Sequence, residues 1–343
     1  MSASVAAIAL LCALNLTETA AQKWEEWPEV KGARATSSDR NLSLYYDPKP
    51  LANVDVQCAF TYKPASGEYF YMYSLVNPAI NELSVASLSI DIRRAEDSQD
   101  TDTESFYIIL AVKEDGTKIT RTYKDAISNR GFIENTVAVG LEPQVIGWSS
   151  GISSKGWASF SSMAESSHVS PGAGVSDLTL RSHGIPTLRD YRVDPSYIIK
   201  LSDLSRLVKE RGLSPEEVET IGVEFYDSLA FHGRTIGPTA PPAELVPTAF
   251  MDNLISMTTE AEKLGWITNA GIARSLQAKL DAARKKYASG NNGAAANILR
   301  ALINEADAQA CQSHEVCKQG QHLTPEAYAL IKYNAQYLLD HVK

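Results

Sequence analysis

Carboxylates and hydroxyls alternate between residues 96 and 104, which read EDSQDTDTE. Oxygen ligands of this kind suit calcium, and extracellular calcium-binding modules work at weak affinity. The spacing departs from that of an EF-hand, which also needs a glycine and a later glutamate. The candidate calcium ligands are therefore Asp97, Asp100, Asp102 and Glu104, with a solvated acidic loop as the alternative interpretation and no other cofactor expected.

Three tyrosines provide a second candidate binding site. Tyr69, Tyr71 and Tyr73 alternate in a β-prone run and therefore share one face of the expected strand. On an open sheet face they would form a flat platform for sugar rings. Burial beneath the segment at residues 200–230 is the alternative that we favour, because large exposed apolar patches are unusual.

The remaining residues do not provide a convincing catalytic motif. His168, His183 and His232 are scattered among many serines and aspartates, and the Ser-rich run of residues 149–167 is typical of strand edges and loops. The chain also lacks a phosphate-binding glycine loop, a dinucleotide fingerprint and an HExxH pair. A pair of carboxylates for glycoside hydrolysis depends on the fold and cannot be read from spacing. The sequence therefore favours a non-catalytic role.

The cysteines and the first residues indicate export. Residues 2–16 form an apolar run followed shortly by small residues, which predicts a signal peptide over residues 1–21 cleaved near Ala21, although no basic residue precedes the run. Cys311 and Cys317 lie six apart in a polar loop and predict a local disulfide. A metal site that adds His314 and His322 is the alternative, although its spacing is wide for zinc. Cys58 is expected to be a small buried side chain.

The net negative charge of the chain bears on which kinds of partner it can bind. The net charge is -9, and the ten basic and nine acidic residues of 250–343 nearly balance, so the excess of acid lies in the preceding part. A nucleic-acid partner is disfavoured because phosphate binding needs a basic face. After residue 21 the chain lacks an apolar run long enough to span a membrane. We expect an extracellular ligand or surface component as the partner of a secreted, periplasmic or cell-surface protein.

The patterning predicts an α+β, multi-domain fold. Residues 22–195 contain many short alternating runs separated by turn residues, which is typical of an antiparallel β-sandwich, with a barrel as the alternative. An Asp115-Gly116 pair between two such runs predicts a hairpin. Residues 196–246 read as a helical insertion followed by the proline-rich linker 237–242. Residues 247–343 show four apolar helical stripes with short connections, which predict a small four-helix domain.

The C-terminal region resembles the FIMAH module, a helical domain found at the ends of secreted and surface-attached bacterial proteins. The resemblance rests on runs beginning at Gly265, Gly271, Ala296 and Leu323, while the cysteine loop lengthens the usual junction between the last two helices. Less specifically, Tyr73–Pro78, Leu88–Ile92 and Ser182–Pro186 resemble bacterial exported β-sandwich domains without an assigned function.

These observations together predict an exported, non-catalytic binding or adhesion protein whose ligand is a cell surface, a glycan or a protein. A secreted hydrolase with its active-site groups on the sandwich loops, and with the helical domain as an accessory module, is the alternative.

Overall fold

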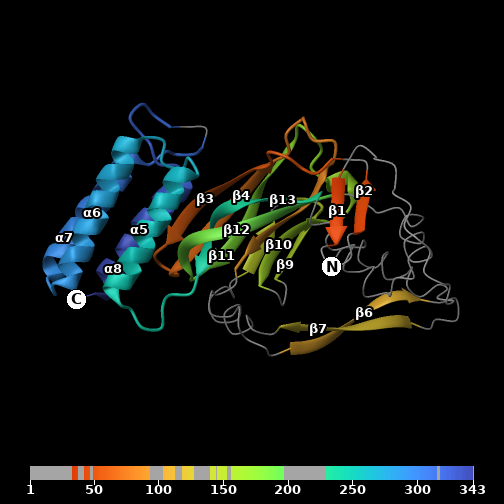
Figure 1. The fold of residues 1–343 in the computed structure, drawn as a ribbon, viewed down its shortest axis with the longest axis horizontal. Coiled ribbons are helices and arrows are strands. Elements are labelled where there is room, and N and C mark those ends of the chain that lie inside the picture. The colour runs from red at the N-terminus through yellow and green to blue at the C-terminus, as the bar shows by residue number, and fades with distance from the viewer. Residues whose placement is uncertain are drawn as a thin grey trace.

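The computed structural model describes a strand-rich body followed by a helical domain (Figure 1). The described residues are 33–37, 42–46, 49–92, 103–112, 118–126, 140–143, 145–152, 156–196, 229–314 and 317–342. The predicted signal peptide, residues 1–21, lies outside them, as do the helices expected between residues 201 and 217. Among the described helices, none is both long and apolar enough to cross a membrane.

Two antiparallel sheets form the body. The five-stranded sheet has the order β13-β12-β5-β10-β9, and the four-stranded sheet has the order β3-β4-β11-β8. The strands are β3 (Asp55–Lys63), β4 (Glu68–Val76), β5 (Val85–Asp91), β8 (Gly140–Pro143), β9 (Trp148–Ile152), β10 (Trp157–Ser162), β11 (Gly174–Ser182), β12 (Ile185–Pro195) and β13 (Phe231–Thr239).

Two separate hairpins complete the strands. β1 (Ala33–Ser37) pairs with β2 (Leu42–Tyr46), and β6 (Thr103–Val112) pairs with β7 (Lys118–Ala126). The second pairing confirms the hairpin predicted from Asp115-Gly116. Figure 1 shows the β6–β7 hairpin apart from the two sheets.

The two sheets enclose the core of the sandwich. Buried residues alternate along the facing strands, and the ring of Tyr73 on β4 lies 6.3 Å from that of Phe160 on β10. The hydroxyl of Tyr73 crosses between the sheets and donates to the carbonyl of Ile236 at 2.9 Å. This arrangement confirms the predicted antiparallel sandwich.

β13 corrects one part of the sequence interpretation. Its residues fall within the range expected to be a helical insertion and linker, yet they pair with residues 185–193 of β12. Pro238 is tolerated because β13 is an edge strand, where one side of the backbone has no ladder partner. Gly233 is required because a Cβ there would lie 2.4 Å from the ring of Tyr191. The connection to the helices therefore starts after Thr239, later than the expected linker, and ends at Val246 before α5.

Four helices follow, as predicted. They are α5 (Pro247–Lys263), α6 (Ala270–Ala288), α7 (Asn292–Gln309) and α8 (Pro325–His341). Asn269 and Asn291 cap α6 and α7 with their side-chain oxygens, and proline occupies the first position of α5 and of α8. The predicted stripes are buried: Leu254, Leu276, Leu299 and Leu330 are all inaccessible to solvent.

The helical domain packs directly on the sandwich. In Figure 1, α5 and α8 lie between the strands and the outer helices α6 and α7. The side chain of Asn334 on α8 donates to the carbonyl of Pro186 at 2.8 Å, and the hydroxyl of Thr187 lies 3.4 Å from the sulfur of Met257 on α5. Because β3 and β13 are the neighbouring edges of the two sheets, α8 covers the side on which the sandwich would otherwise be open.

Candidate functional site

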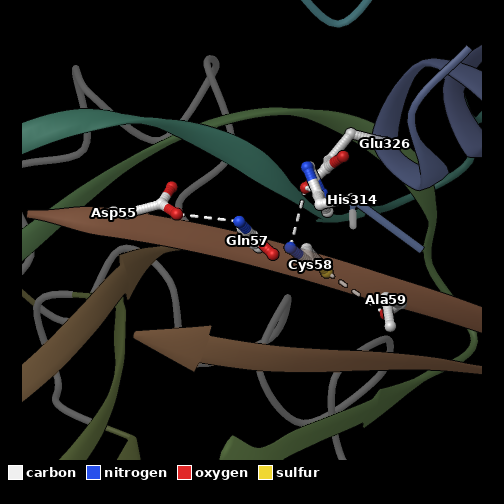
Figure 2. A network of polar contacts seen from close by, with 6 residues as sticks. All are labelled: Asp55, Gln57, Cys58, Ala59, His314 and Glu326. Atoms are coloured by element: carbon white, nitrogen blue, oxygen red, sulfur yellow. Dashed lines mark hydrogen bonds and ion pairs between the residues drawn. The ribbon is translucent and has the colours of Figure 1, made fainter. Parts of the chain in front are cut away.

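The junction between the sandwich and the helical domain contains a buried polar network (Figure 2). Its centre is Glu326 in the first turn of α8, whose side chain is 1% exposed. One carboxylate oxygen of Glu326 accepts two hydrogen bonds of 2.7 Å, from the backbone amide of Cys58 on β3 and from Nε2 of His314. A single buried oxygen thus joins the edge strand of the sandwich to the loop before α8.

The electrostatics of the network follow from burial. Burial lowers the pKa of His314, but the hydrogen bond to Glu326 and the charges of Glu326 and Asp55 outweigh this effect, so the pKa lies above its ordinary value. Burial and the nearby Glu326 charge raise the pKa of the Cys58 thiol well above its ordinary value. The network therefore favours an imidazolium beside a carboxylate, with a neutral thiol close by.

The cysteine loop positions His314. Cys311 and Cys317 form the predicted disulfide, and this confirms the disulfide interpretation over the metal site. The backbone amide of Cys311 donates to the carbonyl of Leu323 at 2.8 Å, which ties the loop to the start of α8. His322, the other histidine considered as a ligand, contacts the hydroxyl of Thr268 instead.

Aromatic side chains gather at the same junction. Phe60 and Tyr62 from β3, Tyr69 from β4 and Tyr333 from α8 are half-buried, and we call these four residues the junction cluster. The ring of Tyr333 lies 4.9 Å from Phe60, 5.8 Å from Tyr62 and 5.8 Å from Tyr69. Burial, followed by the effect of Tyr62, raises the pKa of Tyr69 to about 12, so its hydroxyl stays protonated.

Charged groups adjoin the junction cluster. The hydroxyl of Tyr328 and the amine of Lys332 both donate to the same oxygen of Asp307, each at 2.7 Å. The amine of Lys332 also lies 5.9 Å from the centre of the Tyr333 ring. Partly exposed aromatic rings thus lie beside hydrogen-bond donors and acceptors.

The three tyrosines considered as a sugar platform do not share one environment in the structure. Tyr71 and Tyr73 are fully buried between the sheets, where their hydroxyls donate to the carbonyls of Gly184 and Ile236. Neither ring can therefore face a sugar. The burial that we favoured is present, and the opposite sheet contributes to it through Phe160 and Ile236. Residues 197–228, the segment expected to cover the tyrosines, lie outside the described residues. Of the three tyrosines, only Tyr69 reaches the junction, where it meets Tyr62 and Tyr333. The sequence did not reveal this group because Tyr333 comes from a distant helix.

The structure does not describe the predicted calcium ligands. Asp97, Asp100 and Asp102 lie outside the described residues, and so does the environment of the Glu104 side chain, so calcium binding there stays a prediction. No group of three or more potential metal ligands occurs within the described ranges. His183 contacts the carbonyl of Gly67 at 3.1 Å. Cys58 is fully buried, as expected.

A groove between α6 and α7 lies outside the junction. Its lining is mostly apolar and includes Ala278, Ala282 and Ala301. Because it is shallow and open, it lacks the enclosed aromatic and polar lining typical of a small-molecule site.

Comparison with known proteins identifies the helical part. Residues 251–340, which run from the first turn of α5 nearly to the end of α8, match the family model of the FIMAH domain. No curated protein matches the chain. The match confirms the resemblance seen in the C-terminal sequence, and it assigns the α8 side of the junction to a FIMAH-type domain.

Proposed function

We propose that this protein is an exported, non-catalytic binding protein and that the junction cluster binds a glycan. The observation that carries the proposal is the meeting of half-buried rings from both parts of the molecule, Tyr62 and Tyr69 from the sandwich and Tyr333 from the FIMAH-type domain. Ligand sites occur preferentially where two domains meet, with aromatic lining and a few placed polar groups.

The chemistry of the junction suits a sugar. A pyranose ring has apolar C–H faces that pack on aromatic rings, and hydroxyl edges that need donors and acceptors. The junction cluster offers the rings, and the neighbouring Asp307 and Lys332 offer an acceptor and a donor. Because a carboxylate and an amine pair there, the surface is close to neutral and favours a neutral sugar over a strongly charged one.

Export has independent support. A disulfide between Cys311 and Cys317 persists in oxidising compartments. The FIMAH-type domain and the predicted signal peptide at residues 1–21 agree with a secreted or surface location. N-terminal sequencing of the protein from its native host tests this part: we expect a mature chain that begins near Gln22 outside the cytoplasm, and an intact chain in the cytosol would contradict export.

A glycan array followed by calorimetric titration tests the binding site. We expect the purified protein to bind at least one neutral glycan, and Tyr69→Ala to weaken that binding about tenfold or more, as loss of an aromatic anchor does in other interfaces. Phe70→Ala is the matched control, because Phe70 is the next residue on β4 and lies on the opposite face.

Equal glycan binding by the wild type and Tyr69→Ala would contradict the junction cluster as the binding site. Binding to a protein ligand with no glycan bound would replace the proposed ligand class.

A further inference from the structure

The loop between α7 and α8 connects the two parts of the molecule at a single buried charge. Glu326 is 1% exposed, and its Oε1 accepts from both His314 and Cys58. Its Oε2 is buried and has no hydrogen-bond partner within the described structure. A buried carboxylate is costly unless a positive charge pairs with it. The charge on His314 therefore affects the free energy of burying Glu326 against β3.

Two carboxylates within the described residues act on His314. Glu326 on α8 and Asp55 on β3 are the charged groups that act on it, and the Cys58 thiol on β3 is the other titratable group next to Glu326. Within the described residues, the disulfide loop supplies His314 but no further charge that acts on the imidazole. Both carboxylates favour the imidazolium, and one of them belongs to the sandwich.

We propose that His314 is a pH-dependent latch, which holds the FIMAH-type domain on β3 when it is protonated and loosens this contact when it loses its proton. The proposal goes beyond glycan binding, because it concerns how the two parts are held together and is read out on the protein alone.

The direction of the effect follows from linkage. Docking brings the charge of Asp55, which belongs to the sandwich, to bear on His314, and this charge favours the imidazolium. Protonation of His314 therefore adds to docking, and this contribution is lost as the pH rises through the pKa of His314, which lies above its ordinary value. A pKa that is one pH unit higher in the docked than in the undocked state corresponds to about a tenfold change in the docking equilibrium.

The amide of Cys58 reports the latch directly. It points away from β4, off the edge of the sheet, and donates to Glu326. Ala59, the next residue, directs its amide toward β4 by the alternation of an antiparallel ladder and serves as an internal reference. Hydrogen exchange of both amides, expressed as protection relative to the unfolded chain at each pH, separates docking from the intrinsic pH dependence of exchange.

We expect the protection of Cys58 to fall about tenfold or more between pH 6 and pH 8.5, while that of Ala59 stays constant. In His314→Gln, Cys58 should show weak protection at every pH, and in Glu326→Gln its protection should not vary with pH. His322→Gln, which alters a histidine outside the network, should behave as the wild type.

Constant protection of Cys58 across this range in the wild type would overturn the latch even if neither network variant folds. Equal pH dependence in the wild type and His314→Gln would assign the effect to another group and would also overturn it. Neither outcome depends on glycan binding, so the two proposals fail separately.

Discussion

The backbone amide of Cys58 donates a 2.7 Å hydrogen bond to the carboxylate of Glu326, although 268 residues separate them in the chain. In a soluble helix an acid in the first turn is normally a surface residue that complements the helix dipole. Here the same position is buried and satisfies an amide at the edge of a different domain. The N-terminus of α8 is therefore part of the interface with the sandwich.

Removing this carboxylate should destabilise the whole molecule. In Glu326→Ala the amide of Cys58 and the ring of His314 lose their acceptor inside the interface. Breaking a buried ion pair from one side costs about 3–5 kcal/mol, and we expect a loss of that order in the free energy of unfolding, measured by urea denaturation. Glu260→Ala is the control, because the Glu260–Lys263 pair is exposed and should contribute less than about 1 kcal/mol. Similar losses in both variants would contradict a special role for Glu326.

Opening the cysteine loop should have a smaller effect. Cys311 and Cys317 close a short loop, and the chain-entropy estimate for such a loop is about 2 kcal/mol. We expect Cys311→Ser combined with Cys317→Ser to lower stability by about this amount in calorimetry. A reducing agent should lower the melting temperature of the wild type and leave that of the double variant unchanged. A wild type that is insensitive to the reductant would show that the disulfide contributes little.

The thiol of Cys58 should be unreactive in the folded protein. It is fully buried, and its raised pKa keeps it protonated at neutral pH, whereas the thiolate is the reactive form. For the chain without residues 1–21, a thiol-reactive dye should report no reaction under native conditions and one thiol after unfolding without reductant. Cys58→Ala should give none in either state. Rapid labelling of the folded wild type would place the side chain at the surface.

Tyr73 provides a direct test of the revised tyrosine assignment. Tyr73→Phe removes the hydrogen bond to Ile236 and should lower the free energy of unfolding by about 1 kcal/mol. Tyr73→Ala leaves a cavity in the core and should lower it by about 3–5 kcal/mol. Urea denaturation of both variants, in buffer without a thiol reductant, measures these losses. Thr61→Ala, an exposed change on the neighbouring β3, should stay within about 0.5 kcal/mol. A Tyr73→Ala variant as stable as the wild type would restore the exposed platform.

Much of the helical domain was predictable because its signals are local. The stripe at Leu254 and Met257, the proline at the start of α8 and the cysteine pair each depend on residues a few positions apart. Thr324 occupies the cap position of α8, and its side chain makes no capping hydrogen bond.

The sandwich was predictable in class but not in every strand. β13 was not predicted as a strand because its Gly233, Gly237 and Pro238 are typical of a linker. Packing against the neighbouring strand explains these glycines instead. A Cβ on Gly237 would lie 3.0 Å from the side chain of Arg189, so a larger residue would fit only if this side chain shifted. The junction was beyond sequence reasoning altogether, because Tyr333 and Tyr69 meet only once the two domains dock.

The placement of α8 over β3 has a consequence for any shortened form of the protein. An uncovered edge strand presents free amides and carbonyls that template pairing with another chain. Cutting the chain before Pro247 would strip α8 from β3 and leave such an edge, with the Cys58 amide among its open donors. The sandwich released in this way should self-associate, so proteolysis between the two parts is expected to promote aggregation.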